Sequence, residues 1–552
     1  MQLARRLPSP ASLAVGSMLS RVPGASTGAA AAWLMGKETT AKELILSAEA
    51  QRPSRLLGEI ALNIGMLDSA SRIANLLDSG QSLRSRILWT TGHIDEAIDA
   101  LPGNRRASRL AAERELLSPG WWPTPDKHIV ARPTGTSKTV SIQTSSLHVL
   151  TNSLPHTRSG YAYRSHLVLR TLRDAGHPVI AATRPSYPVT IGRLSLKQVE
   201  TVDGIDYLRH IPTVPGTTPT SRLSEQASWI SAQAKKHGAE VLHTTTHYVN
   251  GLATGAAARA INLPWVYEVR GVLEETWASA GANKVERQAR RDSQRFSLMR
   301  AKEIEVANSA DAVVTLGETM RNYLVLNGVE PDSITVIPNS VSDAVINANT
   351  RCAAADMRAR LGLPRNGIWV GTAASIVGYE GLDDLIDAVT IARTQGSDLR
   401  LLIVGDGVAM PELRERAKAL GENAKFVGRQ PQAEAINFQL GLDVIVIPRK
   451  DRPVCRLVTP IKPIEAMGLA RPVVYSDLPA LRELVPASAG IPTSAEDPES
   501  LALELAKLGN DKHSRLTMGE EGRKYVLRER QWKDIGVRYD ELYKTLAGAQ
   551  RQ

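Results

Sequence analysis

The stretch Thr459-Pro-Ile-Lys-Pro-Ile-Glu-Ala-Met-Gly-Leu-Ala-Arg-Pro-Val-Val-Tyr-Ser-Asp477 decides the fold of this chain. An apolar run precedes it, Asp443-Val-Ile-Val-Ile-Pro448, and is typical of a strand buried on both faces. Thr459 is a favourable N-cap and Pro460 suits a first helical turn, so we expect a helix to begin there. The run 472–476 predicts the next strand. Strand, helix and strand in this order are typical of a parallel α/β unit.

The first turn of that helix carries a lysine and a glutamate on one face. Lys462 and Glu465 are three residues apart, a spacing that makes side chains neighbours on a helix. A helix N-terminus and a lysine attract a diphosphate, and a carboxylate accepts hydrogen bonds from ribose hydroxyls. The pair therefore predicts a site that suits a nucleotide-sugar.

The segment resembles the donor-binding signature of family 4 retaining glycosyltransferases, in particular a subgroup whose helix opens Thr-Pro-Leu-Lys-Pro-Leu-Glu-Ala-Met. The resemblance extends over residues 145–550 through several ordered blocks. It implies an α/β fold of two Rossmann-like domains (the GT-B fold) behind an N-terminal α-helical extension. We expect an acceptor domain at 145–345, a donor-binding domain at 346–535, and at 536–552 a helix that crosses back to the acceptor domain.

Apolar runs of strand length alternate with helical stretches from residue 145 onward, which favours doubly wound sheets. The predicted strands of the first domain are 148–152, 178–182, 241–244, 265–269 and 312–315, after which 334–340 leads toward the second domain. That domain opens with 368–373 and continues with 401–407, 424–429, 443–448 and 472–476.

Residues 1–135 are rich in alanine and helical in pattern. The segments 61–70 and 88–97 both contain Gly-x-x-Asp-x-Ala, offset by 27 residues, which resembles the helical hairpins of a short tetratricopeptide-type array. Such an extension could recruit a protein partner, or could simply pack on the catalytic body. Prolines and glycines between residues 119 and 136 predict a linker.

Composition narrows the classes of function. The chain has 552 residues and a formal net charge of +10. Only three phenylalanines and no basic-aromatic ladder weigh against nucleic acid as a partner. A basic surface also suits anionic lipid, so we expect either a solvated basic face or contact with the inner face of the cell membrane. Two cysteines without metal spacing and no long apolar run favour a cytoplasmic protein.

The resemblance maps several roles to the first domain. Gly160 would close over the donor diphosphate, and the same loop places His156 and Arg158 on the acceptor side. His247, at the end of a strand and before an aromatic residue, matches a catalytic histidine close to the transferred sugar; His243 is interpreted as structural. Arg270 and Glu274 would line the acceptor side, or would form ordinary ion pairs.

The second domain supplies the donor site in this interpretation. Lys462 and Glu465 would be catalytic and donor-binding, with a backbone contribution from Thr459. Ser375 would donate a hydrogen bond where many relatives have basic residues, with Glu380 near the second of these positions. The backbone at Gly428 and Arg429 would meet the nucleobase.

Two further features bear on the chemistry. The family's glutamate eight residues before Glu465 is replaced by Leu457, which leaves the contacts to the donor sugar open. No Asp-x-Asp occurs in the chain, so we expect neither a metal nor another cofactor. Catalysis would then depend on stabilising the departing diphosphate electrostatically.

The sequence therefore predicts a retaining glycosyltransferase that moves a sugar from a UDP-hexose or UDP-N-acetylhexosamine to a glycan, lipid-linked or polyol acceptor, in cell-surface polysaccharide synthesis. Three alternatives stay open. They are a transferase acting on inositol phosphate, as in mycothiol synthesis, a nucleotide-sugar epimerase of the same fold, and a non-catalytic scaffold built on the helical extension.

Overall fold

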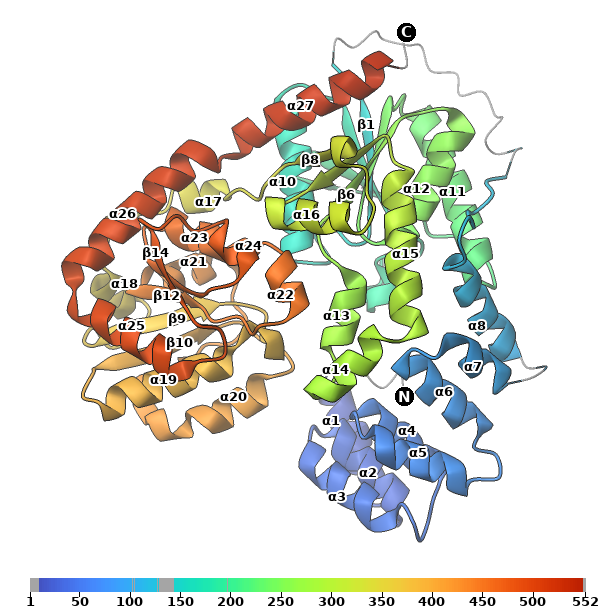
Figure 1. Ribbon diagram of the computed structural model, residues 1–552, viewed down its shortest axis with the longest axis horizontal. Helices are drawn as coiled ribbons and strands as arrows, with labels where there is room; N and C mark the ends of the chain where they lie inside the picture. The colour runs from blue at the N-terminus through green and yellow to red at the C-terminus, as the bar shows by residue number, and fades with distance from the viewer. Residues whose placement is uncertain are drawn as a thin grey trace.

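The computed structural model describes residues 9–101, 103, 105–126, 128, 143–195 and 197–549. Within them, a helical region precedes two α/β lobes, each built on one sheet (Figure 1). This arrangement confirms the expected fold class, two Rossmann-like domains behind a helical extension. Residues 1–8, residues 127 and 129–136 of the predicted linker, and residues 550–552 of the predicted last helix lie outside the described residues.

The sheet of the first lobe has the strand order β3-β4-β2-β1-β5-β6-β7-β8. Its neighbours run parallel except β3 and β4, which form an antiparallel hairpin. The strand order reverses direction between β1 and β5, and ligands of such folds bind at the carboxyl ends of the strands beside this point. The strands are β1 Ser146–Leu150, β2 Val179–Thr183, β3 Val199–Val202, β4 Ile205–Leu208, β5 Val241–Thr245, β6 Trp265–Val269, β7 Ala312–Thr315 and β8 Ile334–Val336.

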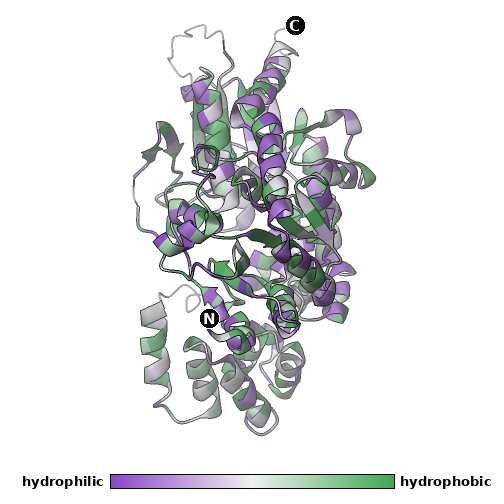
Figure 2. Ribbon diagram, turned by 90° about the vertical axis from the view of Figure 1, so that its left-hand side faces the viewer, coloured by the Kyte–Doolittle hydropathy of each residue, from purple (hydrophilic) through white to green (hydrophobic). Residues whose placement is uncertain are grey.

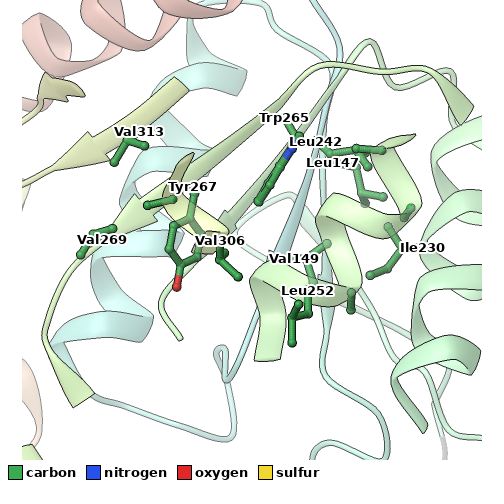
Figure 3. Packing of buried hydrophobic residues seen from close by; sticks show 14 of the residues in the cluster. Leu147, Val149, Ile230, Leu242, Leu252, Trp265, Tyr267, Val269, Val306 and Val313 are labelled. Atoms are coloured by element: carbon green, nitrogen blue, oxygen red, sulfur yellow. The ribbon is translucent and has the colours of Figure 1, made fainter. Parts of the chain in front are cut away.

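The helices of this lobe follow the strands in chain order. They are α10 Gly160–Asp174, α11 Pro219–Lys236, α12 Tyr248–Ile261, α13 Leu273–Ser279, α14 Lys284–Arg291, α15 Gln294–Asn308 and α16 Glu318–Leu326. Leu147, Leu242, Tyr267 and Val306 are fully buried and belong to one hydrophobic cluster of this lobe, part of which Figure 3 shows.

The sheet of the second lobe is entirely parallel, in the order β11-β10-β9-β12-β13-β14, and changes direction between β9 and β12. The strands are β9 Ile368–Ala373, β10 Leu399–Val404, β11 Ala424–Phe426, β12 Val444–Ile447, β13 Val473–Ser476 and β14 Gly490–Thr493. The helices are α17 Asp343–Ile346, α18 Ala354–Arg360, α19 Leu382–Thr394, α20 Met410–Arg416, α21 Gln432–Leu440, α22 Pro453–Leu457, α23 Lys462–Gly468, α24 Pro479–Arg482, α25 Pro498–Asn510 and α26 Lys512–Glu529. In Figure 2 the strands are mainly green and the outer helices carry purple, as expected of buried sheets.

The last helix, α27 (Trp532–Ala549), leaves the second lobe and lies along the first (Figure 1). Its buried residues Trp532, Ile535, Tyr539 and Tyr543 pack in one cluster with residues of α10 and of the first sheet. The chain thus ties the two lobes together a second time, at its C-terminal end.

The helical region has a core of its own. Its helices are α1 Ser9–Leu19, α2 Ala25–Leu34, α3 Glu38–Ala48, α4 Arg55–Asn63, α5 Leu67–Leu76, α6 Gln81–Thr91, α7 Ile94–Asp99 and α8 Arg105–Leu116. The glycines of the two Gly-x-x-Asp-x-Ala segments, Gly65 and Gly92, both have positive φ and connect α4 to α5 and α6 to α7. Ala70 and Ala97 are fully buried in the following helices. The sequence motif therefore marks two equivalent hairpin turns, while membership of the tetratricopeptide class stays a prediction.

The described part of the predicted linker, residues 119–126, packs against the first lobe. Trp121 and Trp122 pack against the core of the first lobe, and the guanidinium group of Arg259 lies 3.8 Å from the Trp122 ring centre. The ammonium group of Lys302, almost completely buried on α15, donates to the Ser118 carbonyl oxygen at 2.7 Å. The packing of the two tryptophan rings stabilises this stretch more than its turn-forming residues loosen it. The helical region is therefore packed against the first lobe.

Candidate functional site

The two lobes meet where the carboxyl ends of their strands lie. Asn339, which follows β8, donates from Nδ2 to the Thr459 carbonyl oxygen at 3.3 Å. Leu457 and Val458 of the second lobe pack against the core of the first. We call residues 375–380, 449 and 459–465 the α23 site; they follow β9 and β12, the two strands beside which the sheet order reverses.

The helix that opens this site begins later than predicted. Its first residue is Lys462, its N-cap is Ile461, and Pro463 rather than Pro460 occupies the first turn. Thr459 is 4% exposed and lies before the helix, and its carbonyl oxygen accepts a hydrogen bond from Asn339 across the lobe junction. A helix of seven residues has a weak dipole, so the charge of this site comes mainly from side chains.

Lys462 forms part of a buried three-residue ion cluster. Its ammonium group pairs with Oε2 of Glu380, and Nη2 of Arg449 lies 3.3 Å from Oε1 of the same carboxylate. Burial alone would raise the pKa of Glu380, but the charges of Lys462 and Arg449 outweigh it and lower this pKa to about 2. One carboxylate is thus shared by two cations, and the cluster keeps a net positive charge.

The backbone at Gly381 brings this cluster together. Gly381 has φ +69°, and a Cβ atom there would overlap the carbonyl oxygen of Pro448. Only glycine allows the loop after β9 to lie this close to the end of β12. The close approach places Glu380 beside Arg449.

Glu465 differs from its neighbours because its carboxylate has no partner. The side chain is half-buried, and no hydrogen bond or ion pair reaches it from the described residues. Burial raises the pKa of Glu465 to about 7, against the opposing charge of Lys462. A desolvated carboxylate without donors is the kind of group that binds hydroxyls of a ligand.

The other predicted donor residues lie at the ends of neighbouring strands. Ser375 is exposed just after β9. Gly428, with φ +70°, follows β11 and accepts a hydrogen bond from the Gly405 amide at 2.8 Å. Arg429 is exposed next to it. The glycine pair 405 and 407 packs directly against the backbone of the loop after β9, which explains its small residues structurally.

Gly160 opens α10 in the first lobe. A Cβ atom on Gly160 would meet nothing within 4 Å, so the surface above it is open. Ser159, in the position where the family shows a second glycine, is the N-cap, and its Oγ accepts from the Ala162 amide at 3.3 Å. The departure at Ser159 therefore has a local reason: a serine caps the helix.

His247 caps α12. Its Nδ1 accepts a hydrogen bond from the Val249 amide at 3.3 Å, which leaves the proton on Nε2. Burial, and then the charge of Arg184, lower the pKa of His247 to about 4. At neutral pH this side chain is an uncharged hydrogen-bond donor rather than a cation.

Arg270 is buried inside the first lobe. It is 3% exposed and donates to Glu268 at 2.9 Å and to the Ser165 hydroxyl at 2.7 Å. Glu268 also accepts from Arg164 at 2.8 Å and bonds His243 at 3.0 Å. This geometry favours the ion-pair alternative for Arg270 over acceptor contact, and it accounts for the structural interpretation of His243.

The remaining acceptor-side candidates do not converge. His156 is half-buried and bonds Glu200 at 2.9 Å, whereas Arg158 is exposed. Glu274 is 2% exposed; one of its oxygens accepts from the Tyr323 hydroxyl at 3.1 Å, and burial raises its pKa. Of these three, Arg158 is the most exposed to solvent.

The sequence did not reveal the charged pairs that lie on the two sides of the lobe junction. Glu268 and Arg164 are buried and paired, but only the presence of a charged residue inside the strand 265–269 could have pointed to them. The pairing of Glu380 with Lys462 has no sequence signal, because 82 positions separate the two residues.

The described residues also bear on membrane-spanning segments and metal sites. No described helix combines the length and apolarity needed to cross a membrane. Among the same residues, no group of three or more histidine, cysteine, aspartate or glutamate side chains is arranged to hold a metal ion. The expectation of chemistry without a cofactor stays a prediction.

Comparison with known families places the lobes. The first matches the model "Glycosyl transferase 4-like domain" over residues 159–340, and the second matches "Glycosyl transferases group 1" over residues 365–511. The loop at Gly160 falls in the first match, and the α23 site falls in the second.

Curated relatives are distant. The chain is 25% identical over 241 residues to a GDP-mannose-dependent phosphatidylinositol monomannoside mannosyltransferase of Corynebacterium glutamicum, covering 43% of this chain and 63% of the relative. It is 28% identical over 232 residues to a D-inositol 3-phosphate glycosyltransferase of Stackebrandtia nassauensis, covering 39% of this chain and 51% of the relative. The chain thus spans less than two thirds of the length of these relatives.

Solved structures support the fold. Sucrose-phosphate synthase from Thermosynechococcus elongatus superposes with a TM-score of 0.57 at 20% identity, over 73% of this chain and all of that one. HepE of Anabaena in complex with UDP superposes with a TM-score of 0.55 at 16% identity and the same coverage. At such identities the likeness concerns the fold alone.

Proposed function

Because this chain is a glycosyltransferase of the GT-B fold, we propose that it moves a sugar from a UDP-hexose or UDP-N-acetylhexosamine to a glycan, lipid-linked or polyol acceptor, with retention of anomeric configuration. The observation that carries the donor assignment is the unpartnered carboxylate of Glu465, three residues from Lys462 on α23. In this proposal the carboxylate accepts hydrogen bonds from the ribose hydroxyls.

Lys462 and Arg449 provide the charge for the departing diphosphate. Both cations share the single carboxylate of Glu380, so positive charge remains for a ligand. Stabilising negative charge that develops on a leaving group is the main electrostatic task of such a site. Glu380 holds the two cations in place, and Ser375 adds a hydroxyl donor from the loop after β9.

The first lobe contributes an open helix end and an imidazole. The amides at the start of α10, beginning at Gly160, face the diphosphate in this proposal, and no side chain at Gly160 hinders them. His247 donates from Nε2 to the transferred sugar, as a neutral group.

The replacement of the family's glutamate by Leu457 is consistent with activity. Leu457 packs against the first-lobe core at the lobe junction, so this position contributes to closing the two lobes. Contacts to the sugar would then come from the backbone amide of Thr459, because the Val458 amide donates to the Val454 carbonyl and the Val458 carbonyl accepts from Arg449.

The acceptor is the least constrained part of the proposal. Relatives named for surface glycans and for inositol phosphate both match this chain over part of their length, so a polyol phosphate is retained as a second candidate acceptor. A cytoplasmic protein at the inner face of the membrane, taking part in cell-surface polysaccharide synthesis, would suit a lipid-linked acceptor.

Turnover tests this proposal. The protein is incubated with UDP-glucose, UDP-N-acetylglucosamine or GDP-mannose, together with inositol phosphate or a polyprenyl-diphosphate-linked glycan. We expect release of UDP and an α-linked product, measured by nuclear magnetic resonance of the anomeric proton. If GDP-mannose is the only one of the three donors that is turned over, the UDP-sugar assignment is wrong. A β-linked product would contradict retention. The absence of nucleotide release from every donor–acceptor pair would contradict the proposed activity.

A further inference from the structure

The helical region contains a cavity that lies outside both lobes. It measures about 900 Å³ and is lined by residues of α4, α6 and α8. This volume is within the range of small-molecule sites, roughly 300–1,000 Å³. Nothing in the proposed transfer reaction uses it.

Five arginines line this cavity, against two carboxylates, and no other charged residue lines it within the described chain. The arginines are Arg55, Arg86, Arg105, Arg106 and Arg109, and the carboxylates are Glu59 and Glu113. The lining therefore has a formal excess of three positive charges. Guanidinium groups bind phosphate through paired N–H donors, and they lose less hydration than ammonium groups do.

Two of the arginines converge on one hydroxyl. Arg55 Nη2 lies 3.1 Å and Arg106 Nη1 lies 2.8 Å from the Oγ of Ser82. Burial and the nearby charge of Arg55 both lower the pKa of Arg106. Two like charges held this close are stabilised by an anion bound near them.

The carboxylates compensate only one side of the lining. Glu59 is buried and pairs with Arg86. Glu113 lies 3.7 Å from Arg109, at the edge of ion-pair distance, and burial raises the pKa of Glu113. The charge near Arg55, Arg105 and Arg109 is therefore the part that remains for a ligand.

Apolar side chains complete the lining. Leu56, Trp89 and Leu110 border the arginines, so the cavity offers a carbon surface beside its charge. We propose that this cavity is a second binding site, for an organic phosphate whose phosphate group lies among Arg55, Arg105 and Arg109 and whose carbon part lies against Trp89 and Leu110. The same chemistry is found in a phospholipid headgroup and in a soluble phosphate ester.

Titration of the full-length protein with inorganic pyrophosphate tests this site. The α23 site should also bind a diphosphate, so we expect two classes of binding in calorimetry. Arg105→Gln combined with Arg109→Gln should weaken one class by at least about tenfold, the loss expected from two charge-assisted contacts. Lys462→Ala should weaken the other class, so failure of either site is seen separately.

Arg84→Gln is the matched control, because Arg84 lies on α6 but does not line the cavity and donates to Asn75 at 2.7 Å. This variant should bind as the natural protein does. Helix content and melting temperature are measured for all variants, and the two single substitutions replace the double one if it unfolds.

Vesicles distinguish the two sources of phosphate. The protein is sedimented with phosphatidylcholine vesicles that contain phosphatidylglycerol. Co-sedimentation that the double substitution abolishes would identify a lipid headgroup as the ligand. Pyrophosphate binding without vesicle binding would identify a soluble ester. Equal pyrophosphate binding by the double variant and the natural protein, or binding of an acidic peptide alone, would overturn the proposal.

Discussion

The two lobes face each other at their junction, and we call the side formed by the first lobe the first wall and the side formed by the second lobe the second wall. The carboxylates of the two walls are paired in different ways. In the first lobe, Glu268 is completely buried and engaged by Arg164, Arg270 and His243. In the second lobe, Glu465 is half-buried and has no partner among the described residues. Glu268 lies near the carboxyl end of β6, and Glu465 lies on α23, between β12 and β13 in the chain.

The difference separates a structural charge from a binding one. A buried carboxylate whose lone pairs are all engaged has nothing to offer a ligand, whereas a carboxylate without donors gains hydrogen bonds when hydroxyls arrive. The pKa values of the two groups differ accordingly. The surroundings of Glu268 shift its pKa well below the usual range, whereas burial raises the pKa of Glu465 to about 7. The first wall is therefore expected to be rigid, and the second to be completed by a donor.

The largest effect should follow from breaking the first wall. Glu268→Gln removes the charge that two buried arginines share, and breaking such a pair costs about 3–5 kcal/mol. We expect a large fall in the denaturant concentration at which the first lobe is half unfolded. Circular dichroism measures this unfolding. Glu465→Gln is the control and should leave that midpoint nearly unchanged. Equal losses in both variants would remove the distinction between the walls.

A smaller effect should appear when the cations of the second wall are altered. Lys462→Ala should weaken binding of UDP-glucose by about thirtyfold, near 2 kcal/mol, because a charge-assisted contact to the diphosphate is lost. Glu380→Gln should act in the opposite direction and strengthen binding, because it removes the carboxylate that neutralises Lys462. Calorimetry measures both, and the same sign for the two variants would contradict the assignment.

The protonation of Glu465 predicts how binding depends on pH. Its raised pKa means that the folded protein holds this proton more firmly than the unfolded chain, so the carboxylate's ionisation lowers stability as the pH rises from about 4.5 to about 7. Ribose hydroxyls favour the ionised form. Affinity for UDP-glucose should therefore rise about tenfold between pH 6 and pH 8 and level off above that. The same titration of Glu465→Gln should show little change; a persisting pH dependence would assign it to another group.

The smallest effect should come from the loop after β9. Ser375→Ala removes one neutral hydroxyl at an exposed position, so we expect affinity for UDP-glucose to fall by about threefold at most. Thr394→Ala, distant from the site at the end of α19, is a suitable control. A loss as large as that of Lys462→Ala would show that this hydroxyl contributes as much to the diphosphate contacts as the lysine does, and would contradict the assigned order.

Much of the fold could be predicted because parallel strands are continuous apolar runs. The strands 265–269, 312–315 and 368–373 match the predicted bounds. The antiparallel hairpin β3–β4 was missed although Asp203-Gly204 between its strands, both with positive φ, is a strong hairpin signal. Strand β14 was missed because Gly490–Thr493 is short and contains a proline.

The site could be predicted only where local spacing determines it. Lys462 and Glu465 share a helix turn, so their proximity follows from the sequence. The ion cluster at Glu380 and the network at Glu268 join residues that are far apart in the chain, and no periodicity encodes such contacts. The sequence leaves Arg270 open between an acceptor role and ordinary ion pairs for this reason, and its buried partners are visible only in the folded chain.

Comparison of UDP with 2′,3′-dideoxy-UDP tests the central claim most directly. If the Glu465 carboxylate accepts from the ribose, the natural protein should prefer UDP by at least about tenfold, the worth of one charge-assisted hydrogen bond. Glu465→Gln should lose most of that preference in a double-mutant cycle. An undiminished preference in the variant would place the ribose elsewhere and contradict this account of the donor site.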